Sequence, residues 1–195
     1  MEFEEMHMKE LPIIVLAAPS CSGKSEVLTH LCKNHYVGVD MGVFIRKILQ
    51  IDIVSRQSRV LKIKEQIEEY GRKKIMSQLL DHLFSMYQLN TMGFVICGMR
   101  HSIDMKILSE LADNKVLNLF IYADSVQRYL WCKNRMRKGD PITFLDFIKI
   151  DYEEIYSGIY ELLASFDFKL ILNNAGLKNL FCEVDNILNN WNNQK

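Results

Sequence analysis

Short apolar runs alternate with amphipathic segments along the 195-residue chain. Such brief apolar runs, each followed by turn or helix signals, are typical of buried strands; they are Ile13–Ala17, Val37–Val39, Phe94–Cys97, Leu117–Tyr122 and Lys169–Leu172. Between them, Gly42–Leu49 and Gln57–Tyr87 carry apolar residues at helical spacing. The alternation indicates an α/β fold with a parallel sheet of about five strands.

The segment that follows the first predicted strand, residues 18–25, gives the clearest indication of function. It follows the phosphate-loop pattern G-x-x-x-x-G-K-[ST] with its first glycine replaced by alanine. Glycine lets backbone N–H groups close around phosphates, lysine reaches the outer phosphates, and the last hydroxyl ligates magnesium. The following helix turns its positive end toward the same place. We therefore predict that ATP binds eight residues, with Mg²⁺ on the last of them: Ala18, Pro19, Ser20, Cys21, Ser22, Gly23, Lys24 and Ser25. The alternative is that Lys24 and Ser25 only open a helix.

Charge and cysteine content narrow the possible partners. The 24 basic and 24 acidic residues give a net charge of zero, so the overall charge indicates neither a nucleic-acid partner nor an anionic membrane. Five scattered cysteines without C-x-x-C spacing predict neither a disulfide framework nor zinc. No apolar run approaches the roughly 18 residues of a membrane span, and the acidic start is unlike a targeting peptide. We expect a cytoplasmic protein of one domain, and the sequence leaves its oligomeric state open.

Arginines follow the predicted strands at the edge where a parallel sheet binds its ligands. Arg100 comes just after the third strand, and the fourth leads to Arg128, Arg135 and Arg137. On a continuous helix Arg128 and Arg135 share one face, whereas Arg137 falls in the next loop, which we predict to be a short lid over about 134–142. Such cations suit phosphoryl transfer. The alternatives are a surface role for Arg100 and a basic solvent loop in place of the lid.

With these features the chain resembles the nucleoside monophosphate kinase superfamily of P-loop phosphotransferases. Within it, the likeness is to the dephospho-coenzyme A kinase-like nucleotide kinases of archaea, and it runs from about Ile13 to Gly176. Besides the phosphate loop, the matching positions are Gly98, Arg100, Asp104, Arg128, Arg135, Arg137, Gly139, Asp140, Phe147, Asp151, Glu154, Gly158, Ile159, Asp167 and Asn173.

The resemblance implies a three-layer α/β/α P-loop NTPase fold in a single kinase domain, 1–195, with an acceptor-binding helical region at about 42–90. It implies transfer of the γ-phosphoryl group of ATP, with magnesium, to a small nucleotide-like acceptor. Arg46 and Arg100 would grip the acceptor, the three later arginines would contact the donor phosphates, and the loop of Asn173 and Ala175 would lie near the adenine. For a hydroxyl acceptor, Asp40 is the candidate base, with capping of the next helix as its alternative role.

Several residues depart from the family pattern. Val43 and Cys97 stand where the family has aspartates, Trp131 and Ile150 replace arginines, and Ala18 and Cys21 make the phosphate loop bulkier. The aspartate missing at Cys97 is the one that organises the magnesium site. Three classes therefore stay open: a small-molecule kinase, a catalytically weakened nucleotide-binding protein, and an ATPase coupled to a protein or RNA partner.

Overall fold

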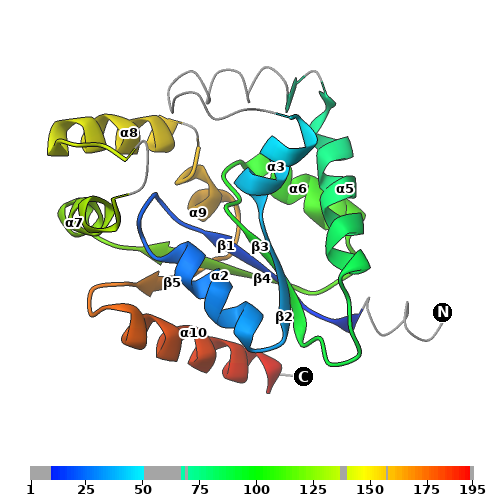
Figure 1. Ribbon diagram of the computed structural model, residues 1–195. Coiled ribbons are helices and arrows are strands. Elements are labelled where there is room, and N and C mark those ends of the chain that lie inside the picture. Colours follow the sequence, from blue (N-terminus) through cyan, green and yellow to red (C-terminus); the bar gives the residue numbers. More distant parts are fainter. Residues whose placement is uncertain (1–9, 51–66, 69, 137–139, 157, 194–195) are drawn as a thin grey trace.

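A computed structural model describes residues 10–50, 67–68, 70–136, 140–156 and 158–193. These residues form a sheet of five parallel strands in the order β2-β3-β1-β4-β5 (Figure 1). The strands are β1 (Ile13–Ala17), β2 (Tyr36–Asp40), β3 (Gly93–Cys97), β4 (Val116–Tyr122) and β5 (Lys169–Leu172). The parallel sheet predicted from the alternating pattern is confirmed.

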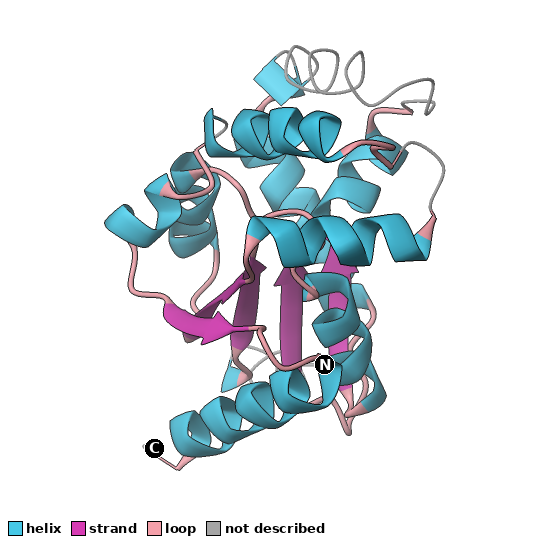
Figure 2. Ribbon diagram, turned by 90° about the vertical axis from the view of Figure 1, so that its left-hand side faces the viewer, coloured by secondary structure: helices cyan, strands magenta, loops and turns pink. Residues whose placement is uncertain are grey.

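Helices connect the strands and cover both faces of the sheet, as Figures 1 and 2 show. They are α2 (Lys24–Lys33), α3 (Met41–Ile48), α5 (Arg72–Ser85), α6 (Ser102–Leu111), α7 (Ser125–Arg135), α8 (Phe144–Tyr156), α9 (Glu161–Ser165) and α10 (Leu177–Asn192). A parallel sheet needs such crossover helices, because each strand must return to the same edge before the next begins.

The alternation of side chains in β1 builds two cores. Ile13 and Val15 point to one face and pack among residues of α3, α5, α6 and α9, whereas Ile14 and Leu16 point to the other and pack among residues of α2 and α10. All the residues of β1 are fully buried, as expected for a central strand with helices on both faces. The result is the three-layer α/β/α arrangement that the resemblance implied.

Two of the expected strands have the predicted bounds, and three are longer. β1 and β5 match, whereas β2 gains Tyr36 and Asp40, and β3 and β4 each begin one residue earlier. The long helical segment predicted over 57–87 is interrupted at Gly71, whose φ of 91° is the left-handed backbone that glycine favours, and α5 begins at the next residue. Residues 57–66 and 69 of that segment lie outside the described residues.

The strand order places the candidate site at the carboxyl end of β1. From β1 the sheet grows through β3 and β2 on one side and through β4 and β5 on the other. Loops leaving the two sides diverge at this point, and the crevice between them is where open α/β sheets bind ligands. The loop of residues 18–23, between β1 and α2, lies there.

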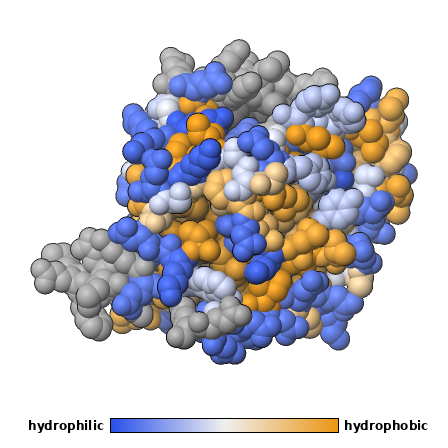
Figure 3. All heavy atoms as spheres, turned by 180° about the vertical axis from the view of Figure 1, so that it is seen from behind, coloured by the Kyte–Doolittle hydropathy of each residue, from blue (hydrophilic) through white to orange (hydrophobic). Residues whose placement is uncertain are grey.

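Apolar side chains reach the outer surface of the described structure. None of the helices in the described part of the chain is long and apolar enough to cross a membrane. Leu170 and Leu172 of the edge strand β5 are about half exposed. Hydrophobic residues also reach the surface on the side turned away from the viewer in Figure 1, interrupted by hydrophilic ones (Figure 3).

Candidate functional site

The phosphate loop, residues 18–25, passes from β1 into the first turn of α2. Gly23 caps this helix with φ 99°, and a Cβ atom there would lie 2.9 Å from Nδ2 of Asn173. Glycine is therefore required both by the backbone conformation and by the space. Since the first N–H groups of a helix have no partner within it, the start of α2 is suited to binding an anion.

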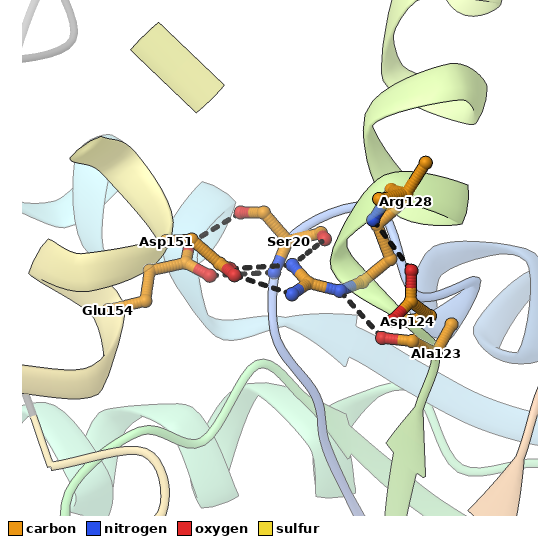
Figure 4. A network of polar contacts seen from close by, with 7 residues as sticks. Ser20, Ala123, Asp124, Arg128, Asp151 and Glu154 are labelled. Carbon is orange, nitrogen blue, oxygen red and sulfur yellow. Dashed lines mark hydrogen bonds and ion pairs between the residues drawn. The ribbon is translucent and has the colours of Figure 1, made fainter. Parts of the chain in front are cut away.

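Three side chains from distant parts of the sequence hold the loop. Nδ2 of Asn173 donates a hydrogen bond to the carbonyl of Ser22 at 3.0 Å, and Nη1 of Arg128 donates to the carbonyl of Ser20 at 3.2 Å. The Ser20 N–H donates to Oε2 of Glu154 at 2.6 Å, and the Ser20 hydroxyl donates to Oε1 of the same carboxylate. Figure 4 shows Ser20 between Glu154 and Arg128.

Arg128 is buried under this network. Its guanidinium makes a bidentate ion pair with Asp151, with both N–O distances at 2.6 Å, and its Nε donates to the carbonyl of Ala123 at 2.9 Å (Figure 4). Only 2 % of its side chain is exposed. Arg128 thus joins α7 to α8 and holds the loop through the Ser20 carbonyl, and its contact with donor phosphates stays a prediction.

Glu154 connects the phosphate loop to Arg100. Its Oε1 lies 3.1 Å from Nη1 of Arg100, which follows β3. Burial raises the pKa of this carboxyl, but the charge of Arg100 and the two hydrogen bonds from Ser20 outweigh burial, so the pKa lies below its usual range. Glu154 is therefore a buried, ionised carboxylate that bridges the loop and the arginine.

Lys24, Cys97 and Asp40 meet at the carboxyl ends of the neighbouring strands. Cε of Lys24 lies 3.7 Å from the position that a Cβ on Gly98 would take, which directs the lysine toward the end of β3. The Cys97 thiol is fully buried and contacts the carbonyl of Lys24 at 3.9 Å. Burial raises its pKa to about 12, so the thiol is protonated at neutral pH. Asp40 pairs with Cys97 in the register of β2 and β3, and its Oδ1 accepts the Val43 N–H at 2.9 Å. The capping role considered for Asp40 is thus present.

The remaining predicted residues lie around this centre. Arg46 turns back toward the start of α3, because its Nη1 lies 3.4 Å from the position of a Cβ on Gly42. Arg135 ends α7 and makes a bidentate ion pair with Asp140 at 2.7 and 2.8 Å. Ala175 is exposed in the loop after β5, and Arg137 lies outside the described residues.

Comparisons with known proteins were made by sequence and by structure, and the structural ones bear on the fold. Comparison with protein-family patterns finds no match. UPF0200 proteins of Thermococcus kodakarensis and Pyrobaculum aerophilum are each 22% identical to the chain and cover 90% of it, with 96% of their own length matched. TT1252 from Thermus thermophilus superposes with a TM-score of 0.62 at 14% identity, covering 93% of this chain and 98% of that one. A gluconokinase from Sinorhizobium meliloti gives a TM-score of 0.60 at 13% identity, covering 96% and 98%. The chain has a P-loop kinase-like fold.

In a P-loop kinase-like fold, nucleotide and usually magnesium bind at the loop, and the residues found there fit both. Ser22 Oγ and Asn173 Oδ1 are buried beside the loop without hydrogen-bond partners in the described structure. Among the described residues, no group of three or more His, Cys, Asp or Glu side chains forms a metal site. Magnesium would therefore be held by the Ser25 hydroxyl, phosphate oxygens and water. Asp40, the register partner of Cys97, would be the carboxylate at the strand ends beside it.

Sequence reasoning missed the parts that Glu154 and Asp151 play at the site. Both entered the sequence analysis as matches to a family pattern, without a role. One signal was present: Phe147, Asp151 and Glu154 are spaced four and three apart, so they share one face of a helix. Phe147 is large and apolar, and carboxylates on a buried face must be paired. This pattern could have indicated partners among the arginines.

Proposed function

We propose that this protein transfers the γ-phosphoryl group of ATP to a small, phosphorylated, nucleotide-like acceptor. The observation that carries the proposal is the bridge formed by Glu154, which binds Ser20 of the phosphate loop and Arg100 after β3 with one carboxylate. A donor-binding loop and an arginine within reach of a single carboxylate are close enough to act on two phosphate groups in contact. Phosphoryl transfer requires this proximity more than it requires covalent chemistry.

Each residue of the centre has a distinct task under this proposal. The phosphate-loop N–H groups and Lys24 hold the outer phosphates of ATP. Arg100, whose side chain is 37% exposed, binds the acceptor phosphate from the β3 side. Arg46 lies beside the start of α3 and assists on the same side. When bound, magnesium neutralises the donor phosphates and helps to keep them in line with the acceptor.

A phosphate acceptor suits the site better than a hydroxyl acceptor. A phosphate oxygen is already ionised near neutral pH, so no base is required. A hydroxyl needs a base within hydrogen-bond reach, and the candidate Asp40 already uses Oδ1 to cap α3. Its second oxygen would have to serve a hydroxyl such as that of dephospho-coenzyme A.

One observation favours a second candidate, a nucleotide-binding protein with little turnover. The protonated thiol of Cys97 stands where the resemblance places an aspartate, and a thiol is a weak partner for magnesium-bound water. Asp40 lies directly beside it in the sheet. Whether Asp40 takes over the task of the missing acid decides between slow catalysis and binding alone.

A panel of acceptors tests the proposal. Coupled ADP release would be measured with ATP, magnesium and each nucleoside monophosphate or dephospho-coenzyme A, alongside the melting temperature with each ligand. ADP release that requires one acceptor supports the kinase. ATP binding without turnover supports the second candidate, and hydrolysis stimulated only by a protein or RNA contradicts both.

A further inference from the structure

Two cysteines meet where the phosphate loop contacts α7. Cys21 lies in the loop directly after Ser20, and Cys132 lies on α7. The side chains of the two cysteines are hydrogen-bonded to each other. Cys132 is fully buried, whereas Cys21 is partly exposed, and both are free thiols. Since a disulfide forms only between cysteines that are already neighbours, this contact meets the first requirement for one.

The fold places these thiols side by side through a second contact next to theirs. Arg128 and Cys132 are four residues apart, so they lie on one face of α7, a single turn from each other. Nη1 of Arg128 donates to the carbonyl of Ser20 at 3.2 Å, as Figure 4 shows, and Cys21 is the next residue of the loop. Two successive turns of α7 therefore meet two successive residues of the loop.

Packing alone does not explain a cysteine at position 21. Its φ is 64°, in the left-handed region, where a residue with a Cβ atom is less stable than glycine. Glycine would adopt this backbone conformation without strain. The side chain of Cys21 thus costs stability in the loop, and its contact with the Cys132 thiol is an interaction that glycine could not make.

We propose that Cys21 and Cys132 form a reversible disulfide that lowers the affinity of the phosphate loop for nucleotide. The oxidant is a low-molecular-weight disulfide, RSSR. Cys21 gives up its proton and its sulfur attacks RSSR, whose S–S bond breaks to release one RSH. Cys132 then gives up its proton and attacks the Cys21 sulfur of the mixed disulfide, which releases the second RSH. Two protein thiols are oxidised, and one RSSR is reduced to two RSH.

The burial of the two cysteines sets the order of these steps. Cys21 is partly exposed, so RSSR reaches it first. Burial and the hydrogen bond with Cys21 raise the pKa of the Cys132 thiol to about 12, so Cys132 is protonated at neutral pH and is a poor nucleophile toward RSSR. It reacts instead with the sulfur held beside it. Small thiols reverse both steps, so the ratio of RSSR to RSH controls the modification.

Disulfide formation changes the loop because the two sulfurs must come closer. Disulfide sulfurs lie about 2.05 Å apart, nearer than two thiols in hydrogen-bond contact. Cys132 is held within a helix, so we expect the loop to make most of the movement. The N–H groups on either side of Cys21 move with it toward α7, away from positions in which they close around phosphates. This effect on nucleotide rests on the proposed function, whereas formation of the disulfide does not.

The test incubates the full chain with oxidised or reduced glutathione. Peptide mapping by mass spectrometry without reductant identifies the disulfide, and calorimetry measures the Kd for ATP in each state. We expect a disulfide between Cys21 and Cys132 and a Kd at least about tenfold higher, both reversed by dithiothreitol. Because linkage is reciprocal, a tenfold effect means that saturating ATP raises the midpoint potential of the thiol pair by about 30 mV.

Cys132→Ala separates the two steps of the exchange. This variant should bind ATP as the reduced wild type does, and oxidised glutathione should leave Cys21 as a stable mixed disulfide, because no second thiol lies beside it. If Cys132→Ala does not fold, Cys132→Ser serves the same purpose. The matched control replaces both exposed cysteines, Cys32→Ser with Cys182→Ser, and should form the disulfide and weaken ATP binding as the wild type does.

The outcomes separate this inference from the proposed function. If the reduced protein binds ATP but oxidation does not join Cys21 to Cys132, the inference is wrong and nucleotide binding stands. The same holds if the disulfide forms and the Kd for ATP is unchanged, or if the response is lost in the Cys32→Ser, Cys182→Ser control. If the reduced protein binds no ATP, the proposed function fails and the inference fails with it.

Discussion

Asp40 and Cys97 are register partners at the carboxyl ends of β2 and β3. The pairing places a carboxylate on the strand next to the buried thiol, which the sequence analysis identified as a missing acid. Neighbouring parallel strands lie about 4.8 Å apart. The site lacks an aspartate at position 97 but has Asp40 within a single strand spacing. Replacing Cys97 by aspartate therefore tests whether the missing acid limits activity.

Cys97→Asp should destabilise the protein without raising its activity, because the new carboxylate would be fully buried beside Asp40. A cost of about 2 kcal/mol or more in the free energy of unfolding is expected. Urea unfolding and magnesium titrations of ADP release would measure both effects. Cys182→Asp on the exposed side of α10 is the control and should change neither. Normal folding with higher activity at low magnesium would show instead that the missing acid limits the rate.

Lys24→Ala should weaken ATP binding and abolish phosphoryl transfer, with little change in melting temperature. Under the proposed function its ammonium contacts phosphate, and a charged hydrogen bond contributes about 1.5–3 kcal/mol, or about 10–150-fold in Kd. Calorimetry with ATP would measure the loss. Lys33→Ala, at the exposed end of the same helix, should bind ATP normally. Equal ATP affinity in the two variants would remove the basis for a nucleotide site.

Arg100→Ala and Arg135→Ala should fail in different ways. Arg100 lies on the β3 side, so its loss should raise the acceptor KM and lower kcat with little effect on ATP. Arg135 lies at the end of α7 and pairs with Asp140. Because it is predicted to contact the donor phosphates during transfer, its loss should mainly lower kcat. Steady-state kinetics with both substrates varied would distinguish them. An Arg100→Ala variant impaired only toward ATP would mean that donor and acceptor sides have been assigned the wrong way round.

Asp151→Ala should lower the free energy of unfolding by about 3–5 kcal/mol, because it leaves the buried guanidinium of Arg128 without its carboxylate. Glu153→Ala, on the exposed side of the same helix, should change it by less than about 0.5 kcal/mol. Urea denaturation of both variants measures the difference. A small loss for Asp151→Ala would mean that the carbonyls of Ala123 and Ser20 alone are sufficient hydrogen-bond partners for the buried Arg128 guanidinium.

The stability that Glu154 provides should depend on pH. Its pKa is lower in the folded protein than the ordinary value of about 4.3, so unfolding takes up a proton in acid. The contribution is fully present above about pH 4.3 and is lost as the pH falls through the folded pKa. The free energy of unfolding of wild type minus that of Glu154→Gln should therefore be constant from pH 6 to 8 and shrink below pH 4.3. A constant difference at all pH values would contradict an ionised buried Glu154.

The sequence predicted those parts of the molecule that depend on local patterns. The strands around Ile14 and Ile96 are short apolar runs, and the phosphate loop is one continuous motif, so both were visible without a structure. The contact between Ser20 and Glu154 joins residues 134 positions apart, and no local pattern encodes it. The break at Gly71 was missed because the apolar spacing continues across it, although glycine alone adopts its φ easily.

The network of Arg128 likewise arises from the tertiary structure. The sequence showed an arginine on a helix that follows a strand, which is compatible with a phosphate ligand. Its burial depends on α8, whose Asp151 and Phe147 cover it from another part of the chain. Such packing decides whether an arginine faces solvent or a carboxylate. The helical spacing of Arg128 and Arg135 in the sequence does not predict it.

The hydrogen bond from Ser20 to Glu154 gives the phosphate loop a competitor inside the protein. Under the proposed function, a phosphate oxygen that accepts the Ser20 N–H displaces a carboxylate already bound there, so apparent ATP affinity includes the work of releasing α8. Thermodynamic linkage makes this coupling reciprocal: whatever draws α8 away from the loop strengthens ATP binding, and ATP in turn favours the released position of α8. Under the proposed function, α8 would therefore oppose ATP binding, and its displacement would report that the nucleotide has bound.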